Sequence, residues 1–227
     1  MSSAASDVYK RQGPDGDGFF KNSKNIMFHK RLSIIDIKGG KQPIENQRYV
    51  LIANGEIYND LEIRNQNNNY NFTSHSDCES ILCVYENFGI AGFKKLRGMF
   101  TFAIYDKITN ELILGRDAFG IKPLYFCFQD QTFVYSSEIQ SILKSNIFKT
   151  KLNYTKTKEL LQLQFTTGRN TIFDGILRLR PGEILTLKDY RIKCSKILDN
   201  PILINNLNIE NDFSIFMLLF NIGLCRI

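Results

Sequence analysis

The sequence predicts an α+β fold of stacked, mainly antiparallel sheets flanked by helices. Short apolar runs rich in β-branched and aromatic residues occur at close spacing, as in antiparallel sheets. A helical pattern separates two groups of these runs, and no internal repeat or low-complexity tract interrupts them. With 227 residues and 43% hydrophobic content, the chain is long enough for one globular domain, or for one domain and the beginning of another.

The first group of strands is predicted at residues 26–37 and 48–53, with Gly39-Gly40 and Pro43 between them. Asn54-Gly55 directly follows the second run and is expected to end it in a tight turn.

The clearest helix follows Ser76. Ser76 and Glu79 have the S-x-x-E spacing of a capping box, and Gly89 is the expected end of the helix. Apolar side chains recur between them at helical intervals, at Cys78, Ile81, Leu82, Tyr85 and Phe88.

The second group of strands is predicted at residues 99–105, 111–115, 124–128 and 132–136. Thr109-Asn110 and Asp130-Gln131 have the composition of hairpin turns. A short helix is expected after Ser137, and a longer one over residues 157–164. Residues 171–191 are expected to form a hairpin that turns at Pro181-Gly182.

Composition excludes several functional classes. The net charge is +6, but basic and acidic residues are interspersed, so no stripe for nucleic acid is predicted. The five cysteines include no C-x-x-C pair and fit a reducing compartment, which favours a cytoplasmic protein. The apolar stretch over residues 213–224 is too short to span a bilayer.

Three segments differ in character. Residues 1–12 are small and polar without apolar periodicity, and are interpreted as a non-native or disordered tail. Residues 13–190 form the predicted domain. Residues 191–227 are interpreted as a linker with the start of a truncated second domain, or as a misread frame.

Four motifs stand in order along the chain: GPDGDG at residues 13–18, HKRLSIIDI at 29–37, NGEIYN at 54–59 and RDAFGIKPLY at 116–125, with HSDCES at 75–80 before the last. Together they resemble the N-terminal glutaminase domain of asparagine synthetases, a class II glutamine amidotransferase of the Ntn-hydrolase type. The resemblance covers residues 13–187 and includes TIFDGILRLRPGE at 171–183. It implies an Ntn-hydrolase-like αββα sandwich, here with the first strand missing.

Hydrolysis of a side-chain amide passes through an oxyanion, which needs preorganised donors such as a side-chain amide and a backbone N–H. Asn54 and Gly55 supply both, and by resemblance they form the oxyanion hole. The missing Cβ of Gly55 would also allow close approach of a ligand. Outside its surrounding motif, Asn-Gly would more simply be a type I′ turn.

Free glutamine carries an α-carboxylate and an α-ammonium group. By resemblance, Arg31 binds the carboxylate, Ile34 and Ile35 supply backbone contacts, and Asp77 and Glu56 hold the ammonium. Taken singly, Arg31 could be a surface cation, and Asp77 could serve the dipole of the helix that it begins.

The remaining two motifs are assigned structural roles. GPDGDG lacks the distal Glu of a calcium loop and is interpreted as a Gly-rich loop beside the active site, and no metal site is predicted. RDAFGIKPLY is interpreted as a Gly-containing turn between buried strands.

The resemblance also implies an N-terminal cysteine whose α-amine acts as the base. Residue 2 is Ser2, the family's His-Arg before GPDG is replaced by Arg11-Gln12, and no cysteine lies near the N-terminus. We therefore expect no glutaminase activity from the polypeptide as written.

The resemblance implies a parent enzyme that hydrolyses glutamine and uses the ammonia for ATP-dependent amidation of aspartate. ATP and Mg²⁺ would bind a C-terminal synthetase domain that this fragment lacks, and the fragment itself needs no cofactor. A homodimer is a further expectation for the full-length parent. Two alternatives stay open: a parent that amidates a sugar acceptor, and a non-catalytic glutamine-binding module.

Overall fold

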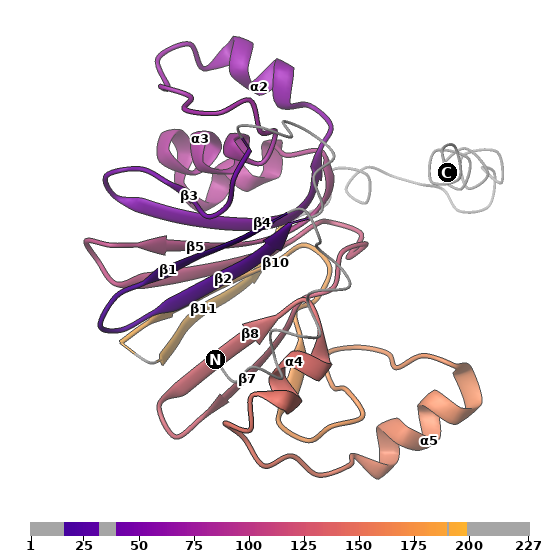
Figure 1. Cartoon of the computed structure of the whole chain (residues 1–227). Helices are drawn as coiled ribbons and strands as arrows, with labels where there is room; N and C mark the ends of the chain where they lie inside the picture. The colour runs from indigo at the N-terminus through magenta and orange to yellow at the C-terminus, as the bar shows by residue number, and fades with distance from the viewer. Residues whose placement is uncertain (1–15, 32–39, 190, 199–227) are drawn as a thin grey trace, which may run out of the picture.

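The computed structural model describes residues 16–31, 40–189 and 191–198. These residues form four layers, with helices on the outside and sheets on the inside (Figure 1). The side chains of Arg31 and Cys194 lie outside the described set, although the backbone of each belongs to a strand.

The largest sheet has six strands in the order β11-β10-β6-β5-β4-β3. Every neighbouring pair in it is antiparallel. The strands are β3 (Ile44–Glu45), β4 (Tyr49–Ile57), β5 (Gly98–Asp106), β6 (Glu111–Arg116), β10 (Glu183–Lys188) and β11 (Arg191–Ile197).

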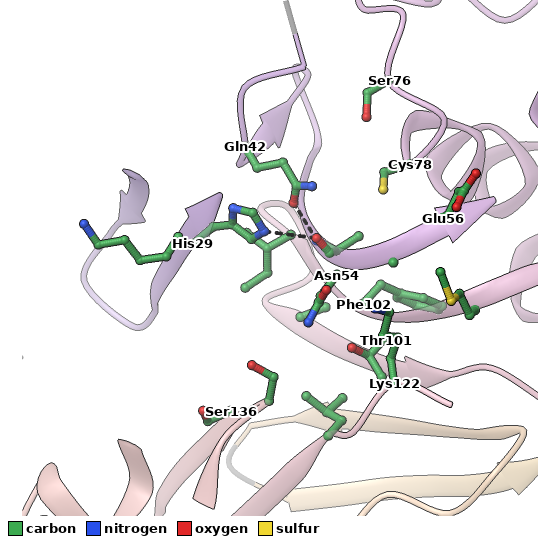
Figure 2. A pocket seen from close by; sticks show the side chains of 18 of the residues that line it. His29, Gln42, Asn54, Glu56, Ser76, Cys78, Thr101, Phe102, Lys122 and Ser136 are labelled. Atoms are coloured by element: carbon green, nitrogen blue, oxygen red, sulfur yellow. Dashed lines mark hydrogen bonds between the residues drawn. The ribbon is translucent and has the colours of Figure 1, made fainter. Parts of the chain in front are cut away.

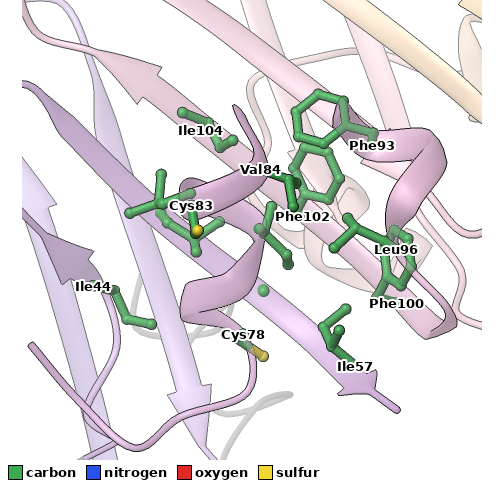
Figure 3. Close-up of a cluster of buried hydrophobic side chains, with 14 of the residues drawn as sticks. Ile44, Ile57, Cys78, Cys83, Val84, Phe93, Leu96, Phe100, Phe102 and Ile104 are labelled. Carbon is green, nitrogen blue, oxygen red and sulfur yellow. The ribbon is translucent and has the colours of Figure 1, made fainter. Parts of the chain in front are cut away.

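Helices cover one face of this sheet. They are α2 (Asp60–Gln66), α3 (Glu79–Phe88) and the 3-10 helix η1 (Gly89–Lys95). Alternate residues of β4 and β5, including Leu51, Ala53, Phe102 and Ile104, pack against apolar side chains of α3, such as Val84 (Figure 3). Because successive side chains of a strand point to opposite faces of the sheet, every second residue of β4 and β5 lies on the side that the helices cover.

The opposite face of the same strands packs against a second layer of strands. This layer contains the β1–β2 hairpin (Gly16–Lys21 and Ile26–Arg31) and the sheet β8-β7-β9 (Thr132–Ser136, Tyr125–Gln129 and Ile176–Arg178). Val50, Ala103 and Tyr105 of the large sheet share a buried cluster with Met27 of β2 and Phe126 of β7.

The fourth layer is α4 (Ile139–Lys144). Its Ile142 is buried with Cys127 of β7 and Ile176 of β9, on the face of the small sheet that points away from the large one. Helix α5 (Tyr154–Leu163) projects from the body and buries none of its side chains (Figure 1). The α+β class and the αββα order of layers are therefore confirmed. The expected loss of the first strand concerns residues before Gly16, which lie outside the described set.

Most of the predicted strands are present within one or two residues of their expected bounds. The chain reverses at both predicted hairpins, with Asn110, Asp130 and Gln131 at positive φ. Such conformations are tolerated by Asn and Asp better than by most residues, which is why these turns could be recognised. Gly89 ends α3 at a φ of 60°, as predicted.

Two turn predictions were wrong. Asn54-Gly55 does not end a strand, because β4 continues to Ile57 and pairs these two residues with Thr101 and Phe100 of β5. Residues 171–191 do not form a hairpin either. The turn at Pro181-Gly182 leads from β9 in the small sheet to β10 in the large one, so it connects two layers.

The prediction of a capping box at the start of α3 was also wrong. Helix α3 has no side-chain cap, and its Glu79 instead accepts hydrogen bonds from the backbone and hydroxyl groups of Thr73 and Ser74, at 2.6–2.9 Å. The acid therefore organises the loop before the helix. Glu79 does stand at the start of the helix, as the spacing predicted. Its hydrogen-bond partners could not be predicted, because they depend on the path of the loop that contains Thr73 and Ser74.

The segments at either end of the chain lie only partly within the described residues, and one interpretation there is corrected. Gly16, Asp17 and Gly18 of the GPDGDG motif belong to strand β1, and Asp17 pairs with Lys30 at 3.0 Å, so this part is not a loop. Residues 1–15 and 199–227, on which the interpretations of a tail and a truncated domain depend, lie outside the described residues. Strand β11 extends the large sheet past residue 190.

Candidate glutamine pocket

A cavity of about 310 Å³ opens between the two layers of strands, at the end where β4 and β5 pass the turn before α3 (Figure 2). The pairing Asn54↔Thr101 places these two residues side by side on the inter-sheet face, and both line the cavity. The opposite wall comes from the segment before β7 and the end of β8, and includes Lys122, Leu124 and Ser136.

Gly55 is required here by the sheet itself. A Cβ on Gly55 would lie 2.0 Å from the Met99 carbonyl oxygen and 2.6 Å from the Phe100 Cα, both in the backbone of β5. The expectation that this glycine makes room for a ligand is thus incomplete, because it first makes room for the neighbouring strand. This close approach fixes the backbone beside Asn54, whose exposed side chain faces the cavity.

Asp77 reaches the cavity from the turn that precedes α3. Its side chain is buried, and its Oδ2 accepts a hydrogen bond of 2.6 Å from the backbone N–H of Ile57, at the end of β4. Burial raises the pKa of this carboxyl group, and the hydrogen bond from Ile57 partly offsets that effect. A buried carboxylate with a raised pKa would be stabilised by a cation in the cavity. Glu56, from β4, lines the same cavity.

The structure therefore brings together four of the seven predicted site residues: Asn54, Gly55, Glu56 and Asp77. Arg31 is placed by its backbone as the last residue of β2, paired with Gly16, while its side chain is not described. Ile34 and Ile35 lie outside the described residues.

Two further side chains hold the edge of β4 at this site. The backbone N–H of Ala53 donates to Gln42 Oε1 at 2.6 Å, and the Ala53 carbonyl lies 3.1 Å from His29 Nε2 (Figure 2). Within the described part of the chain, strand β3 pairs with β4 only at Val50 and Leu51, so at Ala53 these two side chains supply the bonds that a neighbouring strand would make. The sequence did not predict this role for Gln42 or His29, because no sequence pattern indicates a bond from a single Gln or His side chain to a distant backbone group.

Cys78 also lines the cavity and is buried (Figure 2). It follows Asp77 directly, in the middle of the chain. It therefore has no free α-amine of its own that could serve as a base.

The RDAFGIKPLY motif forms a tightly hydrogen-bonded loop after β6. The guanidinium group of Arg116 donates to the carbonyl oxygens of Lys122, Leu179 and Gly120 at 2.5–2.7 Å. The carboxylate of Asp117 accepts from the N–H groups of Phe119, Ile121 and Lys122 at 3.0–3.1 Å. The motif thus has the structural role predicted for it, and it also forms the wall of the cavity that contains Lys122.

Comparison with known proteins shows the family of the chain. The family described as "Glutamine amidotransferase domain" matches residues 2–197. The chain belongs to this family. Among curated proteins, asparagine synthetase [glutamine-hydrolyzing] 1 of Bacillus subtilis is 34% identical over 181 residues, which are 78% of this chain and 28% of that protein. Asparagine synthetase B [glutamine-hydrolyzing] of Escherichia coli is 39% identical over 140 residues, which are 60% and 25% of the two chains.

A solved structure titled "Structure of the allosteric regulatory enzyme of purine biosynthesis" has a TM-score of 0.51 with this amidotransferase domain. It is 20% identical and covers 76% of this chain and 34% of that one, and it supports the fold alone. The chain spans about a quarter to a third of the length of the curated relatives that it matches.

In the part of the chain that the structure describes, no helix is both long and apolar enough to cross a membrane.

Proposed function

We propose that this domain binds free glutamine in the cavity between its sheets and, in the enzyme to which it belongs, releases ammonia from it for ATP-dependent amidation of aspartate. The observation that carries the proposal is the meeting of Asn54 and Asp77, from separate elements, in one cavity of an amidotransferase domain. An amide donor and a buried carboxylate match the two ends of glutamine.

The reacting end of glutamine would lie against Asn54. Attack on the side-chain amide places negative charge on its oxygen, and the Asn54 amide with a backbone N–H at Gly55 would stabilise that charge. The pairing of Gly55 with Phe100 fixes this stretch of backbone before the ligand arrives, so little reorganisation is needed during the reaction.

The other end of glutamine would lie against Asp77 and Glu56, with Arg31 as the expected partner of its α-carboxylate. The ammonium group compensates the desolvation that raises the pKa of Asp77. Binding would therefore favour the ionised form of Asp77. ATP and Mg²⁺ are proposed to act in the part of the relatives that this chain does not span, where aspartate would be activated.

For the 227-residue polypeptide itself we propose binding without hydrolysis. The nucleophile implied by the resemblance is an N-terminal cysteine, while position 2 is Ser2 and the first cysteine in the sequence is Cys78. A glutaminase assay should therefore detect no glutamate above background. Steady release of glutamate would contradict this part of the proposal and leave the binding site standing.

Calorimetric titration with L-glutamine tests the binding. The wild-type chain should bind, and Asp77→Asn should weaken binding about tenfold or more, which is about 1.4 kcal/mol. The matched control is Asp174→Asn, which makes the same chemical change at an exposed position outside the cavity and should bind as the wild type does. Equal affinities for the wild type and Asp77→Asn would reject the pocket assignment.

A sugar acceptor in place of aspartate stays an alternative, because the acceptor would be chosen by residues outside this domain. A non-catalytic glutamine-binding module is the other alternative, and it shares the binding result. Measuring glutaminase activity in the natural full-length protein separates it from the leading proposal.

A further inference from the structure

One arginine on the outer helical layer reaches the loop that carries Asp77. Arg64 lies in α2, which covers the face of the large sheet that points away from the glutamine cavity (Figure 1). Its guanidinium group donates from Nη1 to the Ser74 carbonyl at 3.0 Å and from Nη2 to the Ser76 carbonyl at 2.8 Å. Arg64 does not line the cavity, whereas Ser76 and Asp77 do. It therefore contacts the cavity wall from the side opposite the ligand.

The Arg64 side chain is itself held in one direction. Its Nε donates to both carboxylate oxygens of Asp60, one turn earlier in α2, at 2.8 and 2.9 Å. Asp60 also accepts a hydrogen bond of 2.6 Å from the hydroxyl group of Ser80 in α3. The guanidinium group lies over the Phe72 ring, 4.1 Å from the ring centre. Because a guanidinium group is a rigid planar fork of donors, these contacts also fix the direction of its bonds to the two carbonyl groups.

An acid holds the same loop from a second direction. Glu79, buried at the start of α3, accepts hydrogen bonds from the backbone N–H groups of Thr73 and Ser74, each at 2.8 Å. The cation of α2 thus binds carbonyl oxygens of the loop, and the anion of α3 binds its N–H groups. Charge-assisted hydrogen bonds are stronger than neutral ones, so the backbone from Thr73 to Ser76 is firmly held between the two helices.

The bond from Arg64 to the Ser76 carbonyl bears directly on Asp77. This carbonyl belongs to the peptide group that joins Ser76 to Asp77, and a peptide group is planar, so holding its oxygen restrains the Asp77 Cα. The Asp77 side chain is held at its other end, where Oδ2 accepts the hydrogen bond of 2.6 Å from the Ile57 N–H. The place of the carboxylate in the cavity therefore depends on Arg64 as well as on β4.

From these contacts we infer that Arg64 is a positioning residue for the α-ammonium group of the ligand, because it holds the Asp77 carboxylate where that group binds. The inference rests on the proposed function, in which Asp77 lies against the ammonium group of glutamine. It adds a residue that affects glutamine binding without touching glutamine. Hydrogen bonds weaken steeply as distance and angle depart from their optimum, so a displaced carboxylate binds the ammonium group less tightly.

Hydrogen exchange tests the position of Asp77 without any ligand. The variant is Arg64→Lys, which keeps the positive charge but replaces the planar fork by a single ammonium group. In the 227-residue chain, the Ile57 N–H, whose acceptor is Asp77, should exchange about tenfold or more faster in this variant. The Ala53 N–H is the internal control. It lies in the same strand and also bonds to a side chain, that of Gln42, so its rate should change less than about twofold.

A merely structural role of Arg64 gives a different result. Loss of global stability speeds exchange at Ile57 and Ala53 alike, and that outcome overturns the inference. An unchanged rate at Ile57 also overturns it. The matched control variant is Arg97→Lys, because Arg97 pairs with Glu62 of the same helix, is exposed, and does not line the cavity. This variant should leave both exchange rates unchanged.

A double-mutant cycle then tests whether Arg64 acts on glutamine through Asp77. Calorimetric titration with L-glutamine compares the wild type, Arg64→Lys, Asp77→Asn and the chain with both substitutions. Arg64→Lys should weaken binding about tenfold in the wild-type background, and less than about twofold when Asp77→Asn is already present. Equal losses in the two backgrounds overturn the inference, because Arg64 then affects the cavity by another route. Arg64→Met, which also removes the charge, should enlarge each difference, and Arg64→Lys carries the test if that variant does not fold.

The two measurements keep the proposals apart. Faster exchange at Ile57, with no glutamine binding by the wild type, would reject the proposed function and leave the placement of Asp77 by Arg64 standing. Glutamine binding by the wild type, with unchanged exchange at Ile57 in Arg64→Lys, would do the opposite.

Discussion

Two buried aspartates show how differently the same side chain is used in this domain. Asp117 binds the backbone N–H groups of residues 119, 121 and 122, all within its own loop. Asp77 accepts a hydrogen bond from the N–H of Ile57, which is 20 residues away in the sequence, and it lines the cavity between the sheets. The first carboxylate organises a local turn. The second connects two elements at the place where a ligand would sit, and its pKa is raised because burial is incompletely offset.

The largest expected effect is on stability, at Asp117. Asp117→Ala would leave the backbone N–H groups of Phe119, Ile121 and Lys122 without their acceptor, and should lower the free energy of unfolding by about 3 kcal/mol. Denaturant unfolding measures it, with Asp174→Ala, at an exposed site, as the control that should change little. If Asp117→Ala loses no more stability than the control, the loop does not depend on the Asp117 carboxylate. The contrast drawn between Asp117 and Asp77 would then fail.

The second-largest loss of stability is expected for substitution of Gly55. Gly55→Ala would place a methyl group 2.0 Å from the Met99 carbonyl oxygen and force β4 away from β5, at a cost of about 2–3 kcal/mol. Gly168→Ala is the matched control. It has open space around it and only the strain of a φ of 68°, so about 1 kcal/mol is expected. If chemical denaturation ranks the two variants in the reverse order, the close approach of the strands is not what requires glycine at position 55.

The raised pKa of Asp77 predicts that both stability and glutamine affinity depend on pH. Because its pKa is raised in the folded state, the folded protein binds more protons than the unfolded chain between the usual aspartate pKa and the raised value. Asp77 therefore lowers stability as pH rises through that window. The ammonium group of glutamine favours the ionised form, so glutamine affinity should rise with pH across the same window.

Calorimetry at a series of pH values, with the wild type and Asp77→Asn, measures this dependence. The variant should lose it, and at neutral pH it should be at least as stable as the wild type, since it no longer carries a desolvated charge. A wild-type affinity that stays constant across the window would assign the ammonium group to another acid.

The smallest effect is expected at Gln42. Gln42→Met keeps the length of the side chain and removes the acceptor for the Ala53 N–H, which should cost about 1 kcal/mol of stability. Thermal unfolding measures this change, and glutamine titration reports whether the position of Asn54 next to Ala53 is affected. Weaker binding with unchanged stability would make Gln42 a contact of the ligand, which would extend the site toward the β1–β2 hairpin.

Much of the fold could be predicted from patterns that act within a few residues. Short apolar runs rich in β-branched and aromatic residues predicted the strands, the helical spacing from Cys78 to Phe88 predicted α3, and Asn110 and Asp130 marked turns through their tolerance of positive φ. The predicted site residues Asn54, Glu56 and Asp77 do line one cavity. The motifs indicated them because of their resemblance to a family, and no spacing in the sequence would have brought them together.

The errors occur where a long-range partner replaced a local one. Asn54-Gly55 has the sequence of a tight turn, but pairing along β5 keeps it in a strand. Glu79 has the spacing of a capping box, but the folded loop supplies it with the donors of Thr73 and Ser74. Pro181-Gly182 does turn the chain, and the packing of the layers decides that β9 and β10 enter different sheets.

The sequence by itself determined the class of the fold, the order of its elements and the identity of the polar groups available for glutamine. These depend on side-chain periodicity, turn preferences and residue chemistry, all of which act over short distances along the chain. The tertiary structure decided that Asp77 lies against Ile57 and that Gly55 makes room for its neighbouring strand. Each of these depends on contacts between segments distant in sequence, and only packing of the sheets and helices brings those segments together.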